Sequence, residues 1–377
     1  MIYFLTFFFS VVFLALGEKR YNRNKTVGKI IILVGLLFPI VLAGVRDTSV
    51  GVDVEYYVTK FFDRAHSRLF YGNPFNYARM NNIDILYALL NWYVGYFTKD
   101  VHVLLFIIEA IIILFVYMGF WNLKDGRNTW LLMSYFYLLC YNNSLSTIRQ
   151  SIGIAFILYG ISLIFLFDYS LKGYCLSIVF ILIATGFQTG SFVGIIVVFF
   201  IFAIRRGYNL WKIEISFAFG LFMIYIFRNR MMGIMYMFAG SINSKYISQS
   251  VIVGGGLSDN ITSTLMCLCI VIFSIFVFKR EKKINSMYKV LVLTVISTSL
   301  FMLMFYFFLS TYQPVVRLML SLQILWPLVL SKSSVIAKNN SANKISINSL
   351  TLAMVAAYWY YMYIIVDMVR TANYKIM

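Results

Sequence analysis

The chain has 377 residues, of which 61% are hydrophobic and 19% aromatic, and its formal net charge is +18. Soluble domains are about half apolar, whereas here the apolar residues form long blocks, which excludes an ordinary soluble domain. The blocks lack the alternating ten-residue pattern of outer-membrane barrels, so the sequence predicts an all-α, polytopic membrane bundle. We expect the lipid bilayer to surround it and expect no nucleic-acid partner.

The apolar blocks predict about twelve transmembrane helices in one domain, residues 1–377. Several blocks are shorter than the roughly 20 residues of a perpendicular span, so their ends must extend into polar flanks or the helices must be broken. In chain order the predicted spans are 2–16, 30–45, 101–121, 129–142, 150–167, 174–187, 190–204, 213–227, 262–278, 288–310, 317–331 and 345–366.

Residues 83–98, IDILYALLNWYVGYFT, are apolar but contain Asp84 and Asn91. If this segment does not cross the membrane, nearly all short basic loops fall on one side, which the positive-inside rule makes cytoplasmic. We therefore predict a re-entrant or interfacial helix at 83–98 within an outward loop of residues 46–100. A second outward loop is predicted at 228–261.

The two faces of this predicted topology differ in their basic residues. The cytoplasmic face has 13 Lys and 6 Arg, whereas the outward face has 9 Arg and 4 Lys. A guanidinium binds phosphate or carboxylate with two parallel hydrogen bonds, while a lysine ammonium acts as a point charge. The outward excess of arginine thus suggests recognition of oxyanions.

The first outward motif is GVRDTSVGVDVEYY, residues 44–57, which directly follows an apolar run. Arg46 ends that run, Asp47 follows it, and Asp53 comes after the small residues TSVG. A membrane edge accepts such charges when they snorkel, pair with one another or act in a functional site. Both a local ion pair and an anion-binding role remain open for Arg46.

The second motif, STIRQSIGIAF, places Arg149 and Gln150 where a polar turn leads into an apolar helix. The helix dipole favours anions at this end, so an arginine there needs a compensating partner. A bound anion, shared with free backbone N–H groups, would be such a partner.

Two further polar interruptions are predicted to face outward. The notch ATGFQTGSF implies a tight helical hairpin with Gln188 at its tip, where the amide has either a structural or a functional role. STYQPVVRLML contains Tyr312, Gln313 and Arg317, with Pro314 suited to a first helical turn. Arg317, like Arg149, is therefore predicted to lie at the outward start of an apolar helix.

The sequence contains few other residues that could act in catalysis. The chain has only two histidines, His66 and His102, and its four cysteines lie in or near apolar segments. Small buried thiols are the ordinary interpretation of such cysteines. We expect no metal, no disulfide framework and no cofactor.

In this order the motifs resemble the EpsG-like and Wzy-like polymerases of bacterial exopolysaccharide, capsule and O-antigen. The resemblance extends from about residue 30 to residue 330. It departs from the family pattern at Gln188, where relatives often have a histidine. The motifs that carry it are VRDTSVGVDVEYY, NIDILY, STIRQSIGIAF, ATGFQTGSF and VVRLML.

The resemblance implies a glycosyltransferase of the bacterial inner (cytoplasmic) membrane whose site faces the periplasm or exterior. We predict that it is metal-independent, because arginine would neutralise the charge in place of a metal. Its donor would be a growing glycan on undecaprenyl diphosphate, and its acceptor another lipid-linked oligosaccharide repeat unit, as in lipopolysaccharide or capsule synthesis. A chain-length regulator is a further conceivable partner.

On this resemblance Arg149 and Arg317 would bind the diphosphate, and Arg46 would either join them or pair with Asp53. Such arginines would stabilise the charge that develops on the leaving oxygen. Asp53, ahead of Asp47, is the candidate general base for the acceptor hydroxyl; Asp84 and Asp259 are less favoured. The candidates for contacts with the glycan are Gln150, Gln188, Tyr312 and Tyr57.

Two other classes remain alternatives. A flippase for lipid-linked sugars would also need arginines, but it usually carries charges along an internal path, and Glu109 is the one acidic residue well inside a predicted span. A membrane acyltransferase that modifies polysaccharide usually relies on a buried histidine, for which His66 and His102 are poorly placed.

Overall fold

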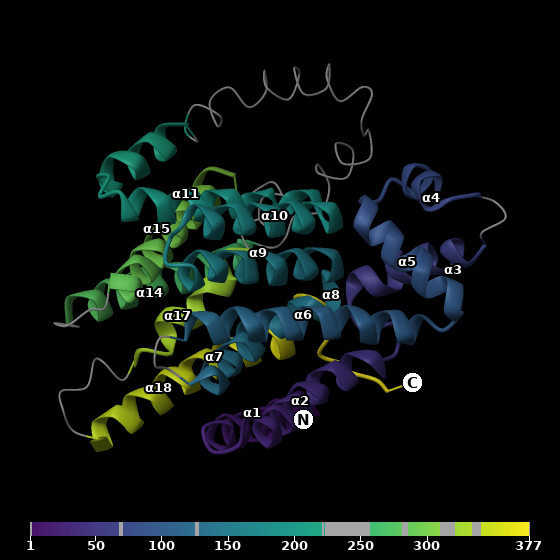
Figure 1. The fold of residues 1–377 in the computed structure, drawn as a ribbon, viewed down its shortest axis with the longest axis horizontal. Helices are drawn as coiled ribbons and strands as arrows, with labels where there is room; N and C mark the ends of the chain where they lie inside the picture. Colours follow the sequence, from purple (N-terminus) through teal and green to yellow (C-terminus); the bar gives the residue numbers. More distant parts are fainter. Residues whose placement is uncertain are drawn as a thin grey trace. The chain divides into compact units, whose positions relative to one another are not determined.

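The structure, a computed structural model, describes residues 2–67, 71–124, 128–220, 222, 257–280, 286–309, 321–333 and 341–376 (Figure 1). These residues are predominantly helical and form no strand. Their one β pairing is an isolated antiparallel bridge between Arg46 and Ile376. The all-α prediction is therefore confirmed.

Six helical segments among the described residues are long and apolar enough to cross a membrane, which confirms a helical membrane protein. The predicted number of about twelve spans is not established, since several predicted spans are shorter helices or lie partly outside the described residues. The six are α1 (Ile2–Tyr21), α2 (Lys25–Gly44), α6 (Val101–Leu123), α9 (Ile148–Leu166), and Thr262–Lys279 and Met287–Phe305 within α14 (Leu257–Arg280) and α15 (Ser286–Leu309).

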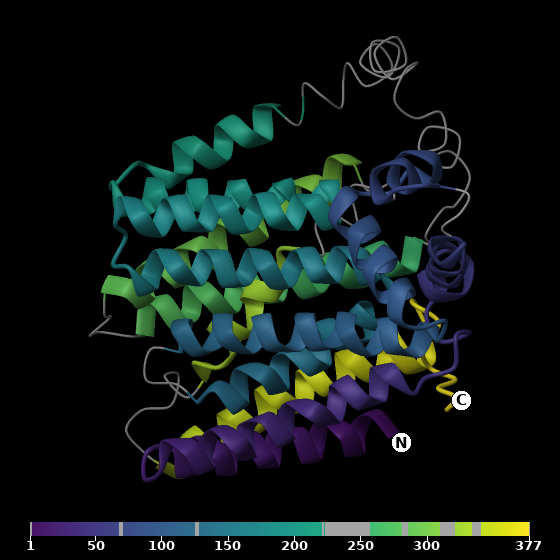
Figure 2. The ribbon, with the colours of Figure 1, turned by 45° about the vertical axis from the view of Figure 1, so that its right-hand side comes forward.

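The chain divides into two compact units, of which the first contains residues 1–195 and 330–377. In this unit α1 and α2 pack side by side, and α9 packs between α6 and α10 (Leu171–Phe187), as both ribbon views show (Figures 1 and 2). In α9, 89% of the apolar window is buried, against 56% in α6. The helix that carries Arg149 is thus the central helix of the unit.

Short helices cover one end of this bundle. They are η1 (Val54–Val58), α3 (Thr59–His66), α4 (Pro74–Asn81) and α5 (Ile85–Phe97), and α3 and α4 both pack on α5. Asn73 caps α4 by accepting a hydrogen bond from the Asn76 N–H, and Asn82 ends it in the left-handed conformation. At 13 residues α5 is about 20 Å long, well below the roughly 30 Å of a hydrocarbon core.

A nearly continuous helical run leads into α9. It consists of α7 (Thr129–Phe136), the π-helical turn η3 (Tyr137–Tyr141) and α8 (Asn142–Ser146). Thr147 then leaves the helical region with φ −88° and ψ 62°, and α9 starts at the next residue. Near the other end of the sequence, α18 (Ser341–Trp359) and η7 (Tyr360–Ile365) return to η3 and bury Trp359, whose Nε1–H donates to Asn142.

The second unit, residues 196–329, contains most of α11 (Gly194–Arg205), a helix over 210–220, α14, α15 and the short helix η5 (Gln323–Leu325). Rings of Phe200, Phe217 and Phe301 pack against one another inside it. The helix α17 (Trp326–Leu330) begins with Trp326, which is fully buried and donates its indole N–H to Ser299. This unit also has an apolar helical core.

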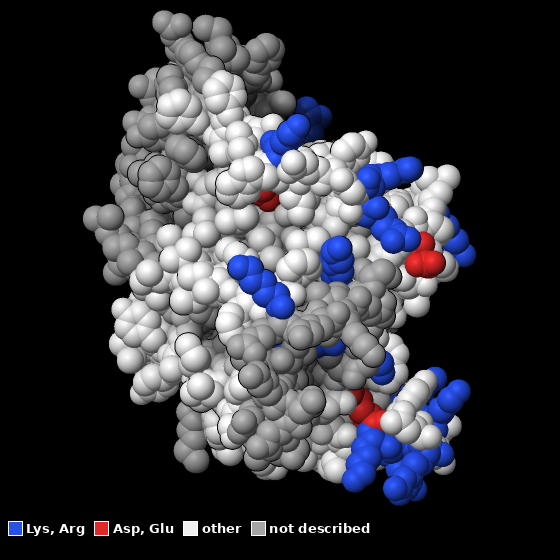
Figure 3. Space-filling view, turned by 90° about the vertical axis from the view of Figure 1, so that its left-hand side faces the viewer, with Lys and Arg blue, Asp and Glu red and all other residues white. Residues whose placement is uncertain are grey.

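Basic side chains gather where α1 turns into α2, with Lys19 and Arg20 in the last turn of α1 and Lys25 opening α2. Figure 3 views the molecule from the side on which this turn lies, and Lys and Arg greatly outnumber Asp and Glu there. Short loops of this kind carry the positive-inside signal. This end of the first unit is the one predicted to be cytoplasmic.

Candidate functional site

Arg149 lies in the first turn of α9, as predicted, and the structure supplies the partner that the helix dipole requires. Its Nη1 lies 3.5 Å from Oδ2 of Asp84, and the two side chains are 23% and 17% exposed. Asp84 is the hydrogen-bond partner of Arg149 among the described residues. A half-buried ion pair therefore fixes the arginine at this end of the bundle.

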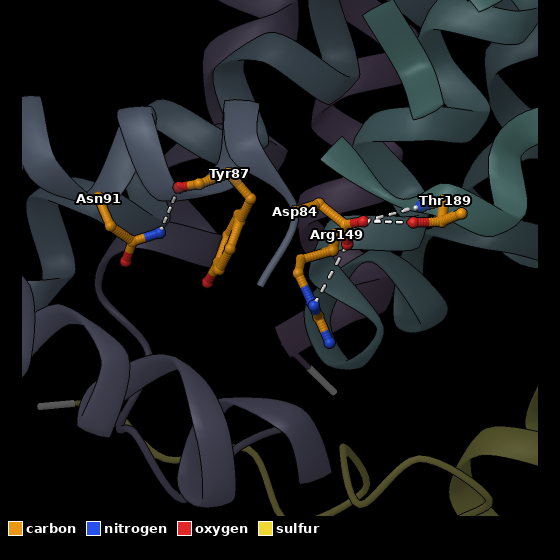
Figure 4. A network of polar contacts seen from close by, with 5 residues as sticks. All are labelled: Asp84, Tyr87, Asn91, Arg149 and Thr189. Atoms are coloured by element: carbon orange, nitrogen blue, oxygen red, sulfur yellow. Dashed lines mark hydrogen bonds and ion pairs between the residues drawn. The ribbon is translucent and has the colours of Figure 1, made fainter. Parts of the chain in front are cut away.

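The other oxygen of Asp84 reaches the predicted notch. Its Oδ1 accepts hydrogen bonds from the backbone N–H of Thr189, at 3.2 Å, and from the Thr189 hydroxyl, at 2.5 Å (Figure 4). Asp84 directly precedes α5, and Thr189 opens η4 (Thr189–Val193). One carboxylate thus joins the starts of α5, α9 and η4, and because both of its oxygens are engaged it acts as a positioning group.

A tyrosine completes this network. The Arg149 guanidinium carbon lies 5.7 Å from the centroid of the buried Tyr87 ring, within range of a cation–π contact. The Asn91 amide nitrogen donates to the Tyr87 carbonyl at 2.8 Å. In Figure 4 the Tyr87 hydroxyl and the Arg149 guanidinium extend to the same side of α5. In the sequence Asp84 and Asn91 are polar residues in an apolar segment, but no sequence pattern links them to Arg149.

The notch is a tight turn between α10 and α11. Gln188 ends α10, and its carbonyl accepts from the Ser191 N–H at 2.8 Å. A Cβ at Gly153 of α9 would lie 2.0 Å from the Ser191 hydroxyl oxygen, so the turn packs closely on α9 and this hydroxyl would have to rotate to admit a larger residue. The half-buried Gln188 lies directly beside Thr189. Gln150, the neighbour of Arg149, is buried at 9% exposure.

The loop predicted to face outward, residues 46–100, brings Asp53 to the same region. The Val52 N–H donates to the Ser146 hydroxyl at 3.2 Å, just before α9, and Asp53 then precedes η1. Val52 directly precedes Asp53, and Ser146 lies three residues before Arg149. Asp53 and Arg149 therefore belong to one neighbourhood. Tyr57, further along, is 43% exposed.

Gly51 fixes the turn that precedes Asp53. Its φ is +98°, and a Cβ there would lie 2.4 Å from the Leu145 carbonyl oxygen. Gly51→Ala combines backbone strain with a clash against main chain, so we expect a loss of about 1–3 kcal/mol in unfolding free energy. Thermal unfolding in detergent should show it as a lower midpoint.

The matched control is Gly72→Ala. Gly72 also has a positive φ, +71°, but no described residue lies within 4 Å of its added Cβ. Only the backbone strain applies there, so its midpoint should fall less than that of Gly51→Ala. Equal effects would show that contact with Leu145 does not constrain the loop.

Asp47 has different surroundings from Asp53. Its Oδ1 accepts the Ser49 N–H at 2.9 Å, and hydrogen bonds from Ser49 lower the pKa of this carboxyl below its ordinary value. A lowered pKa weakens a general base, because proton affinity falls with it. These hydrogen bonds therefore count against Asp47 as the general base.

Arg46 is enclosed, with 1% of its surface exposed. The groups that act on its charge are Glu109 and the phenols of Tyr141, Tyr3 and Tyr374. Glu109 is equally buried and accepts from the Ser144 hydroxyl at 2.9 Å. Within the described part of the chain, neither Nε nor Nη1 of Arg46 has a hydrogen-bond partner. Arg46 thus has neighbours that differ from those of Arg149.

Other predicted site residues lie outside the described residues. They are Tyr312, Gln313 and Arg317, together with most of the second outward loop, 228–261. Among the residues that are described, no group of three or more His, Cys, Asp or Glu side chains is arranged to hold a metal ion.

Apolar helices long enough to span a bilayer, with a polar network at one end of the first unit, define a polytopic helical membrane protein. Residues 29–376 match the EpsG family, and the chain belongs to that family. No curated protein and no solved structure matches the chain. Membership confirms the resemblance seen in the sequence and fits a membrane polysaccharide polymerase.

Proposed function

We propose that the chain is a membrane glycosyltransferase that polymerises undecaprenyl-diphosphate-linked oligosaccharide repeat units at the outer leaflet of the bacterial inner membrane. Family membership and the apolar helices support a membrane polymerase. The observation that carries the proposal is Arg149, half-buried and oriented by Asp84 beside the notch and the Asp53 loop.

The leaving group explains why an arginine is needed. When the acceptor oxygen forms its bond to the anomeric carbon, the bond from that carbon to the diphosphate oxygen breaks, and negative charge develops on the diphosphate. Among the described residues Asp84 engages one Nη of Arg149, so other guanidinium N–H groups can donate to the phosphate oxygens. A partly buried donor stabilises such charge more than an exposed one does.

The acceptor hydroxyl must lose its proton in the same step. Asp53 is the proposed base, because Asp84 is fully engaged and hydrogen bonds lower the pKa of Asp47. The proton moves from the acceptor oxygen to the Asp53 carboxylate. Gln150 and Gln188, next to Arg149 and Thr189, are proposed to contact sugar hydroxyls, and Tyr57 a sugar face. Arg317 and Tyr312 remain proposed ligands.

The test uses the purified full-length protein in detergent with a lipid-linked repeat unit and no added metal. A ladder of lengthened glycans on the lipid carrier is expected. In proteoliposomes, movement of the lipid between leaflets without elongation would instead establish a flippase and overturn the proposal. Intact substrate in both assays would overturn it as well.

A further inference from the structure

Residues 367–376 run along the outward loop and bind it through main-chain contacts. Arg46 and Ile376 form the antiparallel bridge, and the Asp47 N–H donates to the Lys375 carbonyl at 2.9 Å. The Gly51 N–H donates to the Arg370 carbonyl at 3.0 Å. A segment more than 300 residues away in sequence thus holds the loop at two separate points.

The conformation of this segment depends on Asp367. Its Oδ1 accepts the N–H groups of Thr371, at 2.7 Å, and Ala372, at 2.9 Å. Asp367 itself has φ +50°, in the left-handed region where aspartate and asparagine are better tolerated than most residues. One carboxylate therefore closes the turn that presents the Arg370 carbonyl.

The rest of the segment is anchored in the first unit. Thr371 is fully buried; its carbonyl accepts from the Tyr3 hydroxyl at 2.8 Å, and its hydroxyl accepts from the Asn142 amide at 2.9 Å. The Tyr374 hydroxyl donates to the Leu42 carbonyl at the end of α2. Such buried bonds make the segment a fixed support for the loop.

Gly51 links residues 367–376 to Asp53. On one side the Gly51 N–H is bonded to the Arg370 carbonyl, and on the other its Cα faces the Leu145 carbonyl. The Val54 N–H donates to the Gly51 carbonyl at 3.1 Å, which closes the turn around Asp53. Displacing the Arg370 carbonyl would release this turn and move Asp53 relative to Arg149.

We propose that residues 367–376 position the glycosyl-transfer site, with Asp367 as the positioning residue: its carboxylate sets the Arg370 carbonyl, which holds Gly51 and hence Asp53. This inference rests on the proposed function of Asp53. Asp367 acts through the loop and does not touch the substrate.

The side chain of Arg370 provides a matched control. Its Nη1 lies 3.3 Å from the Tyr56 hydroxyl and 3.7 Å from a Glu55 carboxylate oxygen, and the Arg370 and Glu55 side chains are 57% and 44% exposed. Exposed pairs of this kind contribute little to stability. Arg370→Gln removes this pair but keeps the main-chain carbonyl, so it should leave the loop in place.

The experiment compares Asp367→Gly, Asp367→Asn and Arg370→Gln with the wild type. Glycine accepts the positive φ but lacks the acceptor oxygen, whereas asparagine retains both properties. Amide hydrogen exchange of the peptide that covers residues 45–56 is measured together with kcat and KM for elongation. For Asp367→Gly we expect at least tenfold faster exchange and a tenfold lower kcat at unchanged KM, and near wild-type values for the other two variants.

Slow exchange in Asp367→Gly, or wild-type kcat despite fast exchange, would overturn the positioning role. Fast exchange in Asp367→Gly alone, together with a wild type that does not elongate, would refute the proposed function but leave the structural link between the two segments standing. Global unfolding of Asp367→Gly would accelerate exchange throughout the chain, in peptides from α6 as well, and would contradict the local role.

Discussion

Arg149→Lys is expected to lower kcat for elongation by about 10²-fold while the protein still inserts into the membrane. Lysine keeps the positive charge, but it loses the planar fork that can bind Asp84 and a phosphate oxygen at the same time. Loss of one donor to a developing oxyanion usually costs 10²–10³-fold in rate. The effect should appear in kcat, because the leaving charge develops in the transition state.

The control for this variant is Arg20→Lys, at an exposed position in the last turn of α1. It makes the same chemical change away from the site, so elongation should be unchanged. The measurement is the initial rate and length distribution of products from equal amounts of purified protein. A normal rate in Arg149→Lys would remove Arg149 from the mechanism.

Asp53→Asn is expected to lower elongation by about 10²–10⁴-fold, the usual contribution of a general base. The amide is nearly isosteric with the carboxylate, so the turn at Gly51 and the contacts with residues 367–376 should persist. Substrate binding should be largely retained, since the proton moves only in the chemical step. The measurement is single-turnover elongation with saturating acceptor.

Two further variants serve as controls for Asp53→Asn. Asp63→Asn, at an exposed position on α3, makes the same change outside the network and should elongate normally. Asp47→Asn should have a smaller effect than Asp53→Asn, because Asp47 is bonded to Ser49. The reverse order, with Asp47→Asn inactive and Asp53→Asn active, would transfer the role of base to Asp47.

The sequence alone predicts the fold class, and it predicts that Arg149 requires a compensating partner. Long apolar blocks predict helices because a backbone in lipid must satisfy its own hydrogen bonds. An arginine at a helix start predicts a compensating group. Neither argument could identify Asp84, which lies 65 residues away and meets Arg149 only through the packing of α5, α9 and α10.

The environment of Arg46 could not be predicted either. In the sequence Arg46 ends an apolar run beside Asp47 and Asp53, which suggests a local ion pair or an anion-binding role. In the structure Ile376 pairs with its backbone, and its buried side chain lies within electrostatic range of Glu109 and three tyrosines. These contacts join segments far apart in the chain, so local patterns carry no sign of them. The number of spans could not be predicted for a related reason. Short apolar helices such as α5 and α10 are below the length of a perpendicular span, so their sequence alone does not determine whether they cross the membrane.

The most direct test of the account is an experimental structure of the full-length protein in a lipid nanodisc with undecaprenyl diphosphate bound. We predict the diphosphate at the outward end of α9, with at least one phosphate oxygen about 3 Å from an Arg149 guanidinium nitrogen. We also predict that the Asp84 contact is retained and that Asp53 faces the same site. A diphosphate bound elsewhere, with Arg149 still paired only to Asp84, would contradict the account.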